Sequence, residues 1–390
     1  MTSTQHVEFG WFIPTTGDSG YLGVPPEREP SPAYLVQVAQ EAEQAGYEFA
    51  LIPAGGDCLD GWVVGSWVAA HTTKLKTLVA VRPGLIAPVL AARMGATLDR
   101  LSGGRTLINV VTGHYPADLK ATGDPLHADH GARYKRTGEF LEILKGVWEQ
   151  EHNGLSAAAS LNGAGRKIEG FSFQGEHYQV EHAVSRPEPL QRPHPPLYFG
   201  GSSEAGKRVA ARWADVYLMW AEPLDWIQTQ IGEMRRYLEE LEAEAGIRRQ
   251  LRYGLRAQVV VRETEEEAWA AARRIISKVP AEQLEALEKA HATTDAVNQT
   301  RQSQLYRESA GNGHVIGPNL WSGLTALRGG GAVALVGTPE QIAERLAEYR
   351  DAGITSFILS GYPHLEEAEI TGRLLLPAAK KRLAGTIMTN

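Results

Sequence analysis

The sequence predicts an α/β protein in which eight parallel strands close into a barrel wrapped by helices. Four strand-and-helix units follow one another within the first ~150 residues, and such alternation is typical of a parallel sheet covered by helices. The whole chain contains eight strand candidates, the number that closes this kind of barrel. The length of 390 residues allows one large barrel or two ordinary domains, and we expect a single barrel domain over residues 1–390.

The strand candidates are apolar runs, rich in β-branched and aromatic residues, that end at a polar or glycine-containing turn. They are Val7–Pro14, Tyr47–Pro53, Leu75–Arg82, Arg105–Val111, Leu197–Gly200, Val216–Trp220, Tyr253–Val261 and Ser356–Ser360. Several of the helices expected between them begin at a capping residue or a proline, and the first ends at a glycine. They are Ser31–Gly46, Trp62–His71, Pro88–Leu101, Ala132–Glu151, Gly201–Arg212, Pro223–Ala245, Thr264–Ser277, a helix within Leu335–Gly353 that has Thr338-Pro339-Glu340 at its start, and a last helix starting near Glu366.

Two stretches interrupt this alternation. The small, polar segment Asn153–Arg166 predicts an exposed insertion near residues 152–170, and a β-hairpin is expected directly after it over Phe171–Val180. Between Val279 and Ala332 the sequence is polar and glycine-rich, and it shows no pattern of regular structure. A long loop of this kind in a compact domain is usually a lid or a disordered segment, and we favour a mobile lid over residues 279–332.

Composition and charge exclude several classes of function. The formal net charge of −7 and the absence of a basic run argue against a nucleic-acid or anionic-membrane partner. The chain has neither a signal-peptide pattern at its start nor an apolar run that approaches a membrane span, so we expect a cytoplasmic protein. Its one cysteine, Cys58, rules out an internal disulfide and a cysteine-based zinc site. Because no HxH or HExxH spacing occurs, we predict no metal.

The carboxyl ends of the predicted strands carry polar side chains, and parallel strands bring such residues together at one mouth of a barrel. They are Thr15, Cys58, Arg82, Asn109, Thr112, Gly200, Gly201, Ser202, Ser203, Trp220, Arg256, Gln258, Tyr362 and His364. The run Gly200–Ser203 fits a phosphate cradle, although short Gly/Ser turns are also common between strands and helices. Arg256 interrupts an apolar strand, where a buried charge needs either an anionic ligand or an ion-pair partner.

The other candidates have equally plain structural explanations. Cys58 is more simply a small buried residue than a nucleophile, because no histidine lies in its turn. Trp220 is more often a pocket wall than a reacting group. For Tyr362 and His364 a catalytic role is balanced against a core cap and a solvated loop residue.

Several motifs, taken together and in order, resemble the alkanesulfonate monooxygenases, which are flavin-dependent enzymes of the bacterial-luciferase superfamily. The resemblance runs from about Val7 to Leu376 and is interrupted mainly by the Asn153–Arg166 segment. The motifs include GWFIPTTGDSGYLG, LIPAGGDC, NVVTG, PPLYFGGSS, VYLMWAEP, YGLR, LRGGGAVALVG and SGYPHLEEA.

The resemblance implies a luciferase-like TIM (β/α)8 barrel with insertions that uses reduced FMN (FMNH2) and O2. FMNH2 would come from a separate NAD(P)H-dependent FMN reductase, and the enzyme would cleave the C–S bond of a small organosulfur substrate, an alkanesulfonate, to an aldehyde and sulfite. A homodimer or homotetramer is expected. The implied catalytic residues are Cys58, Trp220, Arg256, Arg328, Tyr362 and His364. The implied cofactor-binding residues are Asn109, Thr112, Tyr134, Gly200, Gly201, Ser202, Ser203 and Tyr362. The implied substrate contacts are Thr16, Trp220, Arg256, Gln258 and Arg328.

Two positions depart from the family pattern, since Thr16 and Gln258 stand where the family has histidine. Both changes remove a titratable group, so they bear on proton handling and substrate choice and not on the barrel or the flavin. Related enzymes act on methanesulfonate or on a dialkyl sulfone, but the retained Arg256 and Arg328 favour an anionic substrate. More distant alternatives are an F420-dependent oxidoreductase and a non-catalytic flavin-binding homologue.

Overall fold

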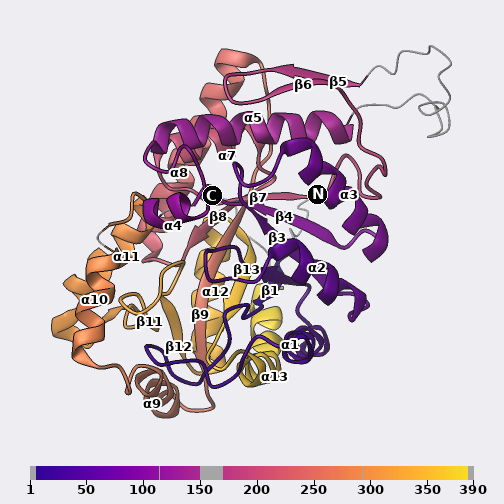
Figure 1. The fold of residues 1–390 in the computed structure, drawn as a ribbon. Coiled ribbons are helices and arrows are strands. Elements are labelled where there is room, and N and C mark those ends of the chain that lie inside the picture. The colour runs from indigo at the N-terminus through magenta and orange to yellow at the C-terminus, as the bar shows by residue number, and fades with distance from the viewer. Residues whose placement is uncertain (1–5, 114, 150–169, 292, 385–390) are drawn as a thin grey trace.

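The computed structural model describes residues 6–113, 115–149, 170–291 and 293–384. Its main sheet closes into a parallel TIM barrel, because the strands run in the order β9, β13, β1, β2, β3, β4, β7, β8 and β8 pairs again with β9 (Figure 1). All eight strand predictions are confirmed within a few residues. The strands are β1 (Glu8–Phe12), β2 (Phe49–Ile52), β3 (Lys76–Val81), β4 (Thr106–Val110), β7 (Leu197–Phe199), β8 (Val216–Trp220), β9 (Arg252–Val261) and β13 (Ile354–Ser360).

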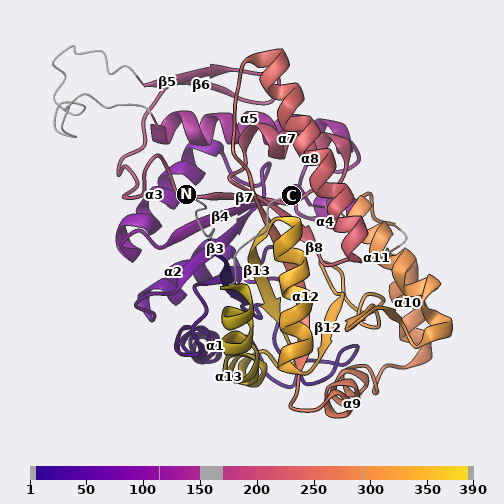
Figure 2. The same cartoon turned by 180° about the vertical axis from the view of Figure 1, so that it is seen from behind.

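Helices surround the barrel on its outer side, as Figures 1 and 2 show from opposite directions. They are α1 (Pro32–Ala45), α2 (Gly61–Ala70), α3 (Pro88–Ser102), α4 (Pro116–Ala121), α5 (His130–Glu149), α7 (Glu204–Trp213), α8 (Leu224–Ala245), α9 (Glu265–Ile275), α12 (Pro339–Ala352) and α13 (His364–Leu383). The predicted caps of α1 are confirmed. Ser31 accepts a hydrogen bond from the backbone N–H of Tyr34, and Gly46 ends the helix in the left-handed region with φ 91°.

Apolar side chains fill both layers of the fold. Inside the barrel, residues of neighbouring strands form one buried cluster: Phe12, Phe49, Leu51, Leu78, Leu107, Tyr198, Val216, Leu218 and Ile358. A larger cluster lies between the strands and the outer helices. In the described part of the chain, no helix is long and apolar enough to cross a membrane.

The predicted hairpin is confirmed as β5 (Phe171–Gln174) paired antiparallel with β6 (Gln179–Ala183). The insertion predicted at Asn153–Arg166 lies outside the described residues.

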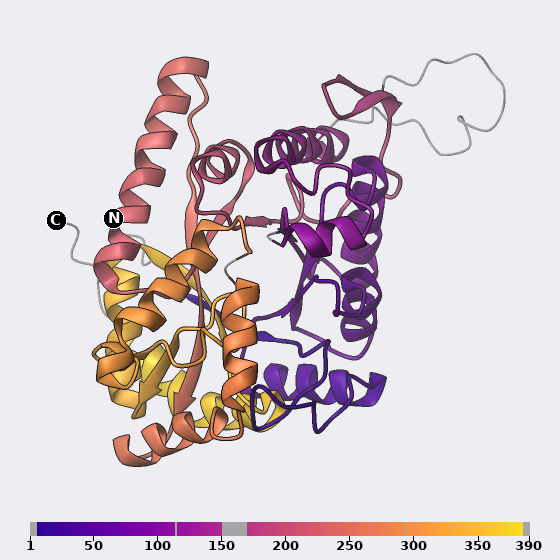
Figure 3. The ribbon, with the colours of Figure 1, turned by 60° about the vertical axis from the view of Figure 1, so that its left-hand side comes forward.

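The prediction that residues 279–332 lack regular structure is wrong. The segment contains α10 (Ala281–His291), α11 (Val297–Glu308), a short 3₁₀ helix (Ala310–Asn312) and a hairpin of β10 (Val315–Gly317) and β11 (Leu320–Trp321). Figures 1 and 3 show α10 and α11 in orange at one side of the barrel. The buried side chains of α11 are Gln299, Gln302 and Leu305, so its packed face is mostly polar and leaves no apolar periodicity to detect.

The helix predicted within Leu335–Gly353, with Thr338, Pro339 and Glu340 at its start, is confirmed as α12, but a strand that was not predicted precedes it. Residues Ala334–Gly337 form a short strand, β12, that pairs parallel to β9 from Gln258 to Val261, beyond the last β8 pair at Arg256. Thr338 then starts α12 through a capping box with Gln341. Because strand and helix join without a loop, the apolar run reads as one element. The last residues of β9, Gln258 to Val261, therefore extend beyond the part of the strand that pairs with β8 in the barrel.

Candidate functional site

The carboxyl ends of β1, β9 and β13 bring an arginine pair and two ring side chains to one mouth of the barrel. Arg256 lies on β9 opposite Trp220 of β8 and Ile358 of β13. Its guanidinium carbon lies 4.3 Å from the centre of the Phe12 ring, and that of Arg328 lies 4.8 Å from the same centre. Arg328 comes from the segment before β12, so a residue far along the chain completes the group that the strands begin.

Arg256 is almost completely buried, and none of the described residues gives it a negative partner. Only 4% of its surface is exposed, and its Nε donates a hydrogen bond to the carbonyl of Gly330 at 3.0 Å. Both Nη atoms are buried and without a hydrogen-bond partner among the described residues, where no carboxylate pairs with Arg256 or Arg328. Burial holds the pKa of Arg256 well below its usual range, and the charge of Arg328 adds to this effect. A buried cation without a counter-charge is stabilised by a bound anion, so the arrangement favours an anionic ligand.

Arg328 is bound by two neutral side chains. Its Nη1 donates to the Tyr362 hydroxyl at 2.6 Å. The amide of Gln258 satisfies its neighbours when its oxygen accepts from the same Nη1 at 2.7 Å and its nitrogen donates to the carbonyl of Ser360 at 3.1 Å. Burial raises the pKa of the Tyr362 hydroxyl, against the opposing charge of Arg328, so this side chain is a neutral phenol at neutral pH.

His364 forms a buried pair with Asp18, a residue that the sequence did not single out. The Nδ1 atom of His364 lies 2.8 Å from Asp18 Oδ1, and its backbone N–H donates to Asp18 Oδ2 at 2.6 Å. Burial lowers the pKa of His364 although Asp18 attracts a proton to it. The signal available in the sequence was the acidic residue in the polar loop TTGDSGYLG after β1.

A glycine run covers the arginines. Gly331 has φ 74°, and a Cβ atom there would lie 3.1 Å from the Trp220 indole and 3.3 Å from Arg256 Cδ. Only glycine combines this backbone conformation with such a close approach. The run thus closes over Trp220 and places the Gly330 carbonyl on Arg256.

Two predicted residues lie at the edge of this group. Cys58 is half-buried, and burial raises the pKa of its thiol, so the side chain is not activated as a thiolate. The side chain of Thr16 is exposed, whereas the hydroxyl of the adjacent Thr15 is buried and without a hydrogen-bond partner among the described residues. The substrate role of Thr16 stays a prediction.

Most of the predicted cofactor residues lie at the end of β4 and at the start of α7, whereas Tyr134 comes from α5 and Tyr362 follows β13. The hydroxyl of Tyr134 lies 2.8 Å from the point that a Cβ of Gly201 would occupy. Ser202 is hydrogen-bonded to Gln230 at 3.1 Å and also to Asn298 of α11. Ser203 caps α7 by accepting from the Gly206 N–H at 3.2 Å. Both serine hydroxyls are therefore used within the protein, and the glycines and the helix start remain as the anion-binding part.

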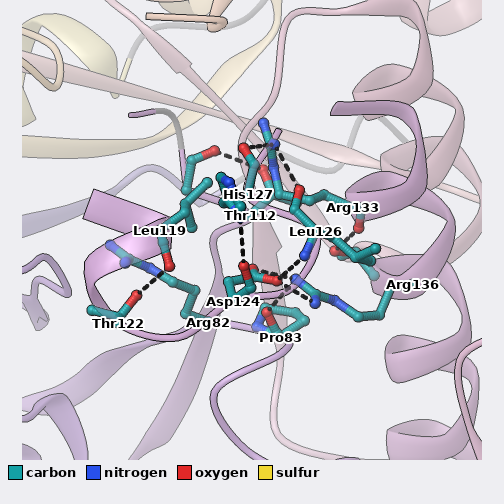
Figure 4. Close-up of polar contacts among 12 residues, drawn as sticks. Arg82, Pro83, Thr112, Leu119, Thr122, Asp124, Leu126, His127, Arg133 and Arg136 are labelled. Atoms are coloured by element: carbon teal, nitrogen blue, oxygen red, sulfur yellow. Dashed lines mark hydrogen bonds and ion pairs between the residues drawn. The ribbon is translucent and has the colours of Figure 1, made fainter. Parts of the chain in front are cut away.

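Two further candidates, Arg82 after β3 and Asn109 on β4, differ in whether the protein supplies them with a partner. Arg82 donates to Asp118 at 2.9 Å, so its charge is matched within the protein, unlike that of Arg256. Asn109 is buried, and its Oδ1 has no hydrogen-bond partner among the described residues. Figure 4 shows Arg82 and Thr112 beside the connection from β4 to α5, where Arg136 pairs with Asp124 at 2.7 and 2.6 Å.

Comparison with known proteins agrees with this architecture. A family model described as luciferase-like monooxygenase matches residues 7–356. Among solved structures, a riboflavin lyase with modified FMN and riboflavin superposes with a TM-score of 0.74 at 21% identity, covering 99% of this chain and 94% of that chain. A long-chain alkane monooxygenase gives a TM-score of 0.73 at 20% identity, covering 97% and 92%. The EDTA monooxygenase from Chelativorans sp. BNC1 gives 0.72 at 19% identity, covering 98% and 95%. At such identities the superpositions establish a shared fold.

Proposed function

The chain belongs to the luciferase-like monooxygenase family, and from this premise we propose that it cleaves the C–S bond of an alkanesulfonate with FMNH2 and O2. The products are an aldehyde and sulfite. The reduced flavin is supplied by a separate NAD(P)H-dependent FMN reductase. A riboflavin lyase that contains modified FMN, together with the alkane and EDTA monooxygenases, shares the barrel, which supports the use of flavin.

The residues at the barrel mouth fit a flavin. The buried Oδ1 of Asn109, which has no hydrogen-bond partner in the part of the chain that the structure describes, can accept a hydrogen bond from a polar ring edge. The flavin phosphate would lie at Gly200 and Gly201 beside Tyr134, where the glycines let an anion approach the start of α7. When bound, FMNH2 supplies the electrons that activate O2.

One observation carries the choice of an anionic substrate. Arg256 and Arg328 lie over the same Phe12 ring without a carboxylate partner, and two buried Nη atoms of Arg256 have no acceptor among the described residues. A sulfonate is a permanent anion with three acceptor oxygens, so it matches the guanidinium donors through charge-assisted hydrogen bonds. A neutral sulfone would leave the buried charge unpaired, which is costly.

The remaining residues orient the substrate and handle protons. Arg328 donates a hydrogen bond to the Tyr362 oxygen, so the Tyr362 O–H can donate to the substrate. The neutral His364 offers Nε2 as a proton acceptor. Gln258 holds Arg328 without exchanging a proton, because an amide does not titrate. Trp220 and the glycine run over it exclude water from the arginines.

The experiment combines the protein with FMN, a flavin reductase and NADH, and measures sulfite released from alkanesulfonates of increasing chain length. Dimethyl sulfone is the neutral comparison, and a reaction without reductase is the control. We expect sulfite only from sulfonates and only with the reductase present. Turnover of the sulfone alone, or oxidation of reduced F420 without sulfite, would reject the proposal.

A further inference from the structure

We propose that Asp18 is the positioning residue of the site, holding His364 with its proton on Nδ1 so that Nε2 faces the reaction as an acceptor. The assignment of His364 to proton handling rests on the proposed function. The hydrogen-bond arrangement from which the role of Asp18 follows does not.

The carboxylate of Asp18 is enclosed by donors. It is 3% exposed, and it accepts the backbone N–H of Ser19 at 2.9 Å and the hydroxyl of Tyr34 in addition to both contacts with His364. Burial opposes its charge, but the contact with His364 and the hydrogen bonds from the His364 ring, the His364 backbone N–H and Tyr34 keep the pKa of Asp18 below its ordinary value. An ionised carboxylate only accepts hydrogen bonds, so the Nδ1 atom of His364 must donate.

The opposite ring nitrogen is left free for chemistry. His364 Nε2 is buried and has no hydrogen-bond partner among the described residues. The ring centre lies 5.4 Å from that of Phe12 and 5.0 Å from that of Tyr362, the residue bound to Arg328. A buried acceptor without a donor costs free energy unless a ligand group meets it, so its place beside the arginine pair points to a role in the reaction.

The charges that face His364 come from several elements. Asp18 lies in the loop after β1, Arg256 on β9, and Arg328 in the segment before β12. The neutral hydroxyls of Tyr34 and Tyr362 complete the surroundings, and Arg28 and Glu366 form an ion pair behind Tyr34. Burial and the two arginines favour a neutral imidazole, whereas Asp18 favours the imidazolium. A neutral ring with a fixed tautomer is the state that can accept a proton at Nε2.

Asp18 also supports the fold, and the test must separate this role from the first. The N-cap residue of α13 is Pro363, which has no capping side chain, so Asp18 supplies the cap from 346 residues away through the His364 N–H. A matched control is Asp99, a fully buried aspartate that accepts from the backbone N–H groups of Leu190 and Gln191 at 2.7 and 2.9 Å. Asp99 lies on α3 and holds the segment between β6 and β7 through these bonds.

The experiment records ¹⁵N NMR spectra of histidine-labelled enzyme, with His364→Gln identifying the resonances of His364. We expect the wild type to carry the proton on Nδ1. In Asp18→Asn the amide oxygen still caps α13, but the NH2 group must face Nδ1, so the proton moves to Nε2. We expect kcat of Asp18→Asn to fall about 100-fold or more, with KM changing less than about threefold. Asp99→Asn should lower the unfolding midpoint and leave the His364 resonances unchanged.

Three results would overturn the inference. A wild-type spectrum with the proton on Nε2 does so without any variant, even if Asp18→Asn does not fold. An unchanged tautomer in folded Asp18→Asn does so as well. A fall in kcat that Asp99→Asn matches would assign Asp18 a structural role only. Absence of sulfite from the wild type would reject the proposed function, but the tautomer would still test the position of Asp18.

Discussion

Replacing Arg256 with methionine is expected to stabilise the free protein and to impair the reaction. The guanidinium is buried, and within the described ranges of the chain its two Nη atoms have no hydrogen-bond partner. Its favourable contacts there are the Gly330 carbonyl at 3.0 Å and the face of the Phe12 ring. Desolvation of an unpaired cation costs several kcal/mol, so removing it should raise the free energy of unfolding by about 1–3 kcal/mol. Each charge-assisted bond to the substrate contributes about 1.5–3 kcal/mol, or about 10- to 150-fold in affinity. With two such bonds lost, kcat/KM should fall at least ~100-fold.

The assay pairs urea unfolding, followed by circular dichroism, with sulfite release by the same preparations. Arg133→Met is the matched control, because Arg133 is equally buried but pairs with Asp295 and donates to the carbonyls of Leu126 and His127 at 3.2 and 2.8 Å. Removing Arg133, the buried member of this pair, should destabilise the protein, because Asp295 then loses its counter-charge. If both methionine variants lose stability to a similar extent, Arg256 already has an internal counter-charge and the argument for an anion site is refuted.

Three further predictions concern the same mouth. Gln258→His should change the ranking of sulfonates by chain length more than the shape of the pH–rate profile; a new ionisation with an unchanged ranking would contradict this. Burial raises the pKa of Glu222 to about 7. Protonated Glu222 therefore contributes to the free energy of unfolding at pH values below the usual pKa of a glutamate, and this contribution is lost as the pH rises through about 7. The urea midpoint of Glu222→Gln minus that of the wild type should therefore be larger at pH 8 than at pH 5. The same difference at both pH values would refute this prediction. Because the flavin is proposed to arrive reduced, FMNH2 should bind more tightly than FMN in anaerobic and aerobic titrations, and equal affinities would count against it.

The barrel strands were predictable because each is a short apolar run whose side chains fill one of two cores. Helix α11 was not, because two of its three buried residues, Gln299 and Gln302, are polar, and Gln302 is buried through hydrogen bonds that no sequence pattern reveals. Gln302, for example, donates to the carbonyl of Ala221 at 3.1 Å. Periodicity detects burial by apolar contact, and it misses burial by polar satisfaction.

In the candidate site, too, some features were predictable from the sequence and others were not. Strand order places Arg256, Tyr362 and His364 at one mouth, because parallel strands present their carboxyl ends together. The partners of these residues were not predictable. Asp18 lies 346 residues from His364, and Gly330 lies 74 residues from Arg256, so each contact depends on how a loop folds back over the rim.

The contacts of α11 also change which part of residues 279–332 is expected to move. Arg301 pairs with the buried Glu222, Asn298 bonds Ser202, and Gln302 accepts from Ala332 and Val333 at 3.3 Å, so α11 is fixed to the barrel at the end of β8.

We expect the glycines after Arg328 to move more readily than α11. Gly330 and Gly331 adopt φ 86° and 74°, and the Gly330 carbonyl is held by Arg256, the residue that we expect the substrate to engage. Hydrogen exchange followed by mass spectrometry should therefore show slow exchange in α11 and fast exchange around residues 329–331, with protection of the glycines when FMNH2 and a sulfonate are both bound. Equal exchange in the two places, with or without ligands, would show that the whole segment responds as one unit and that the glycine run is not the moving part.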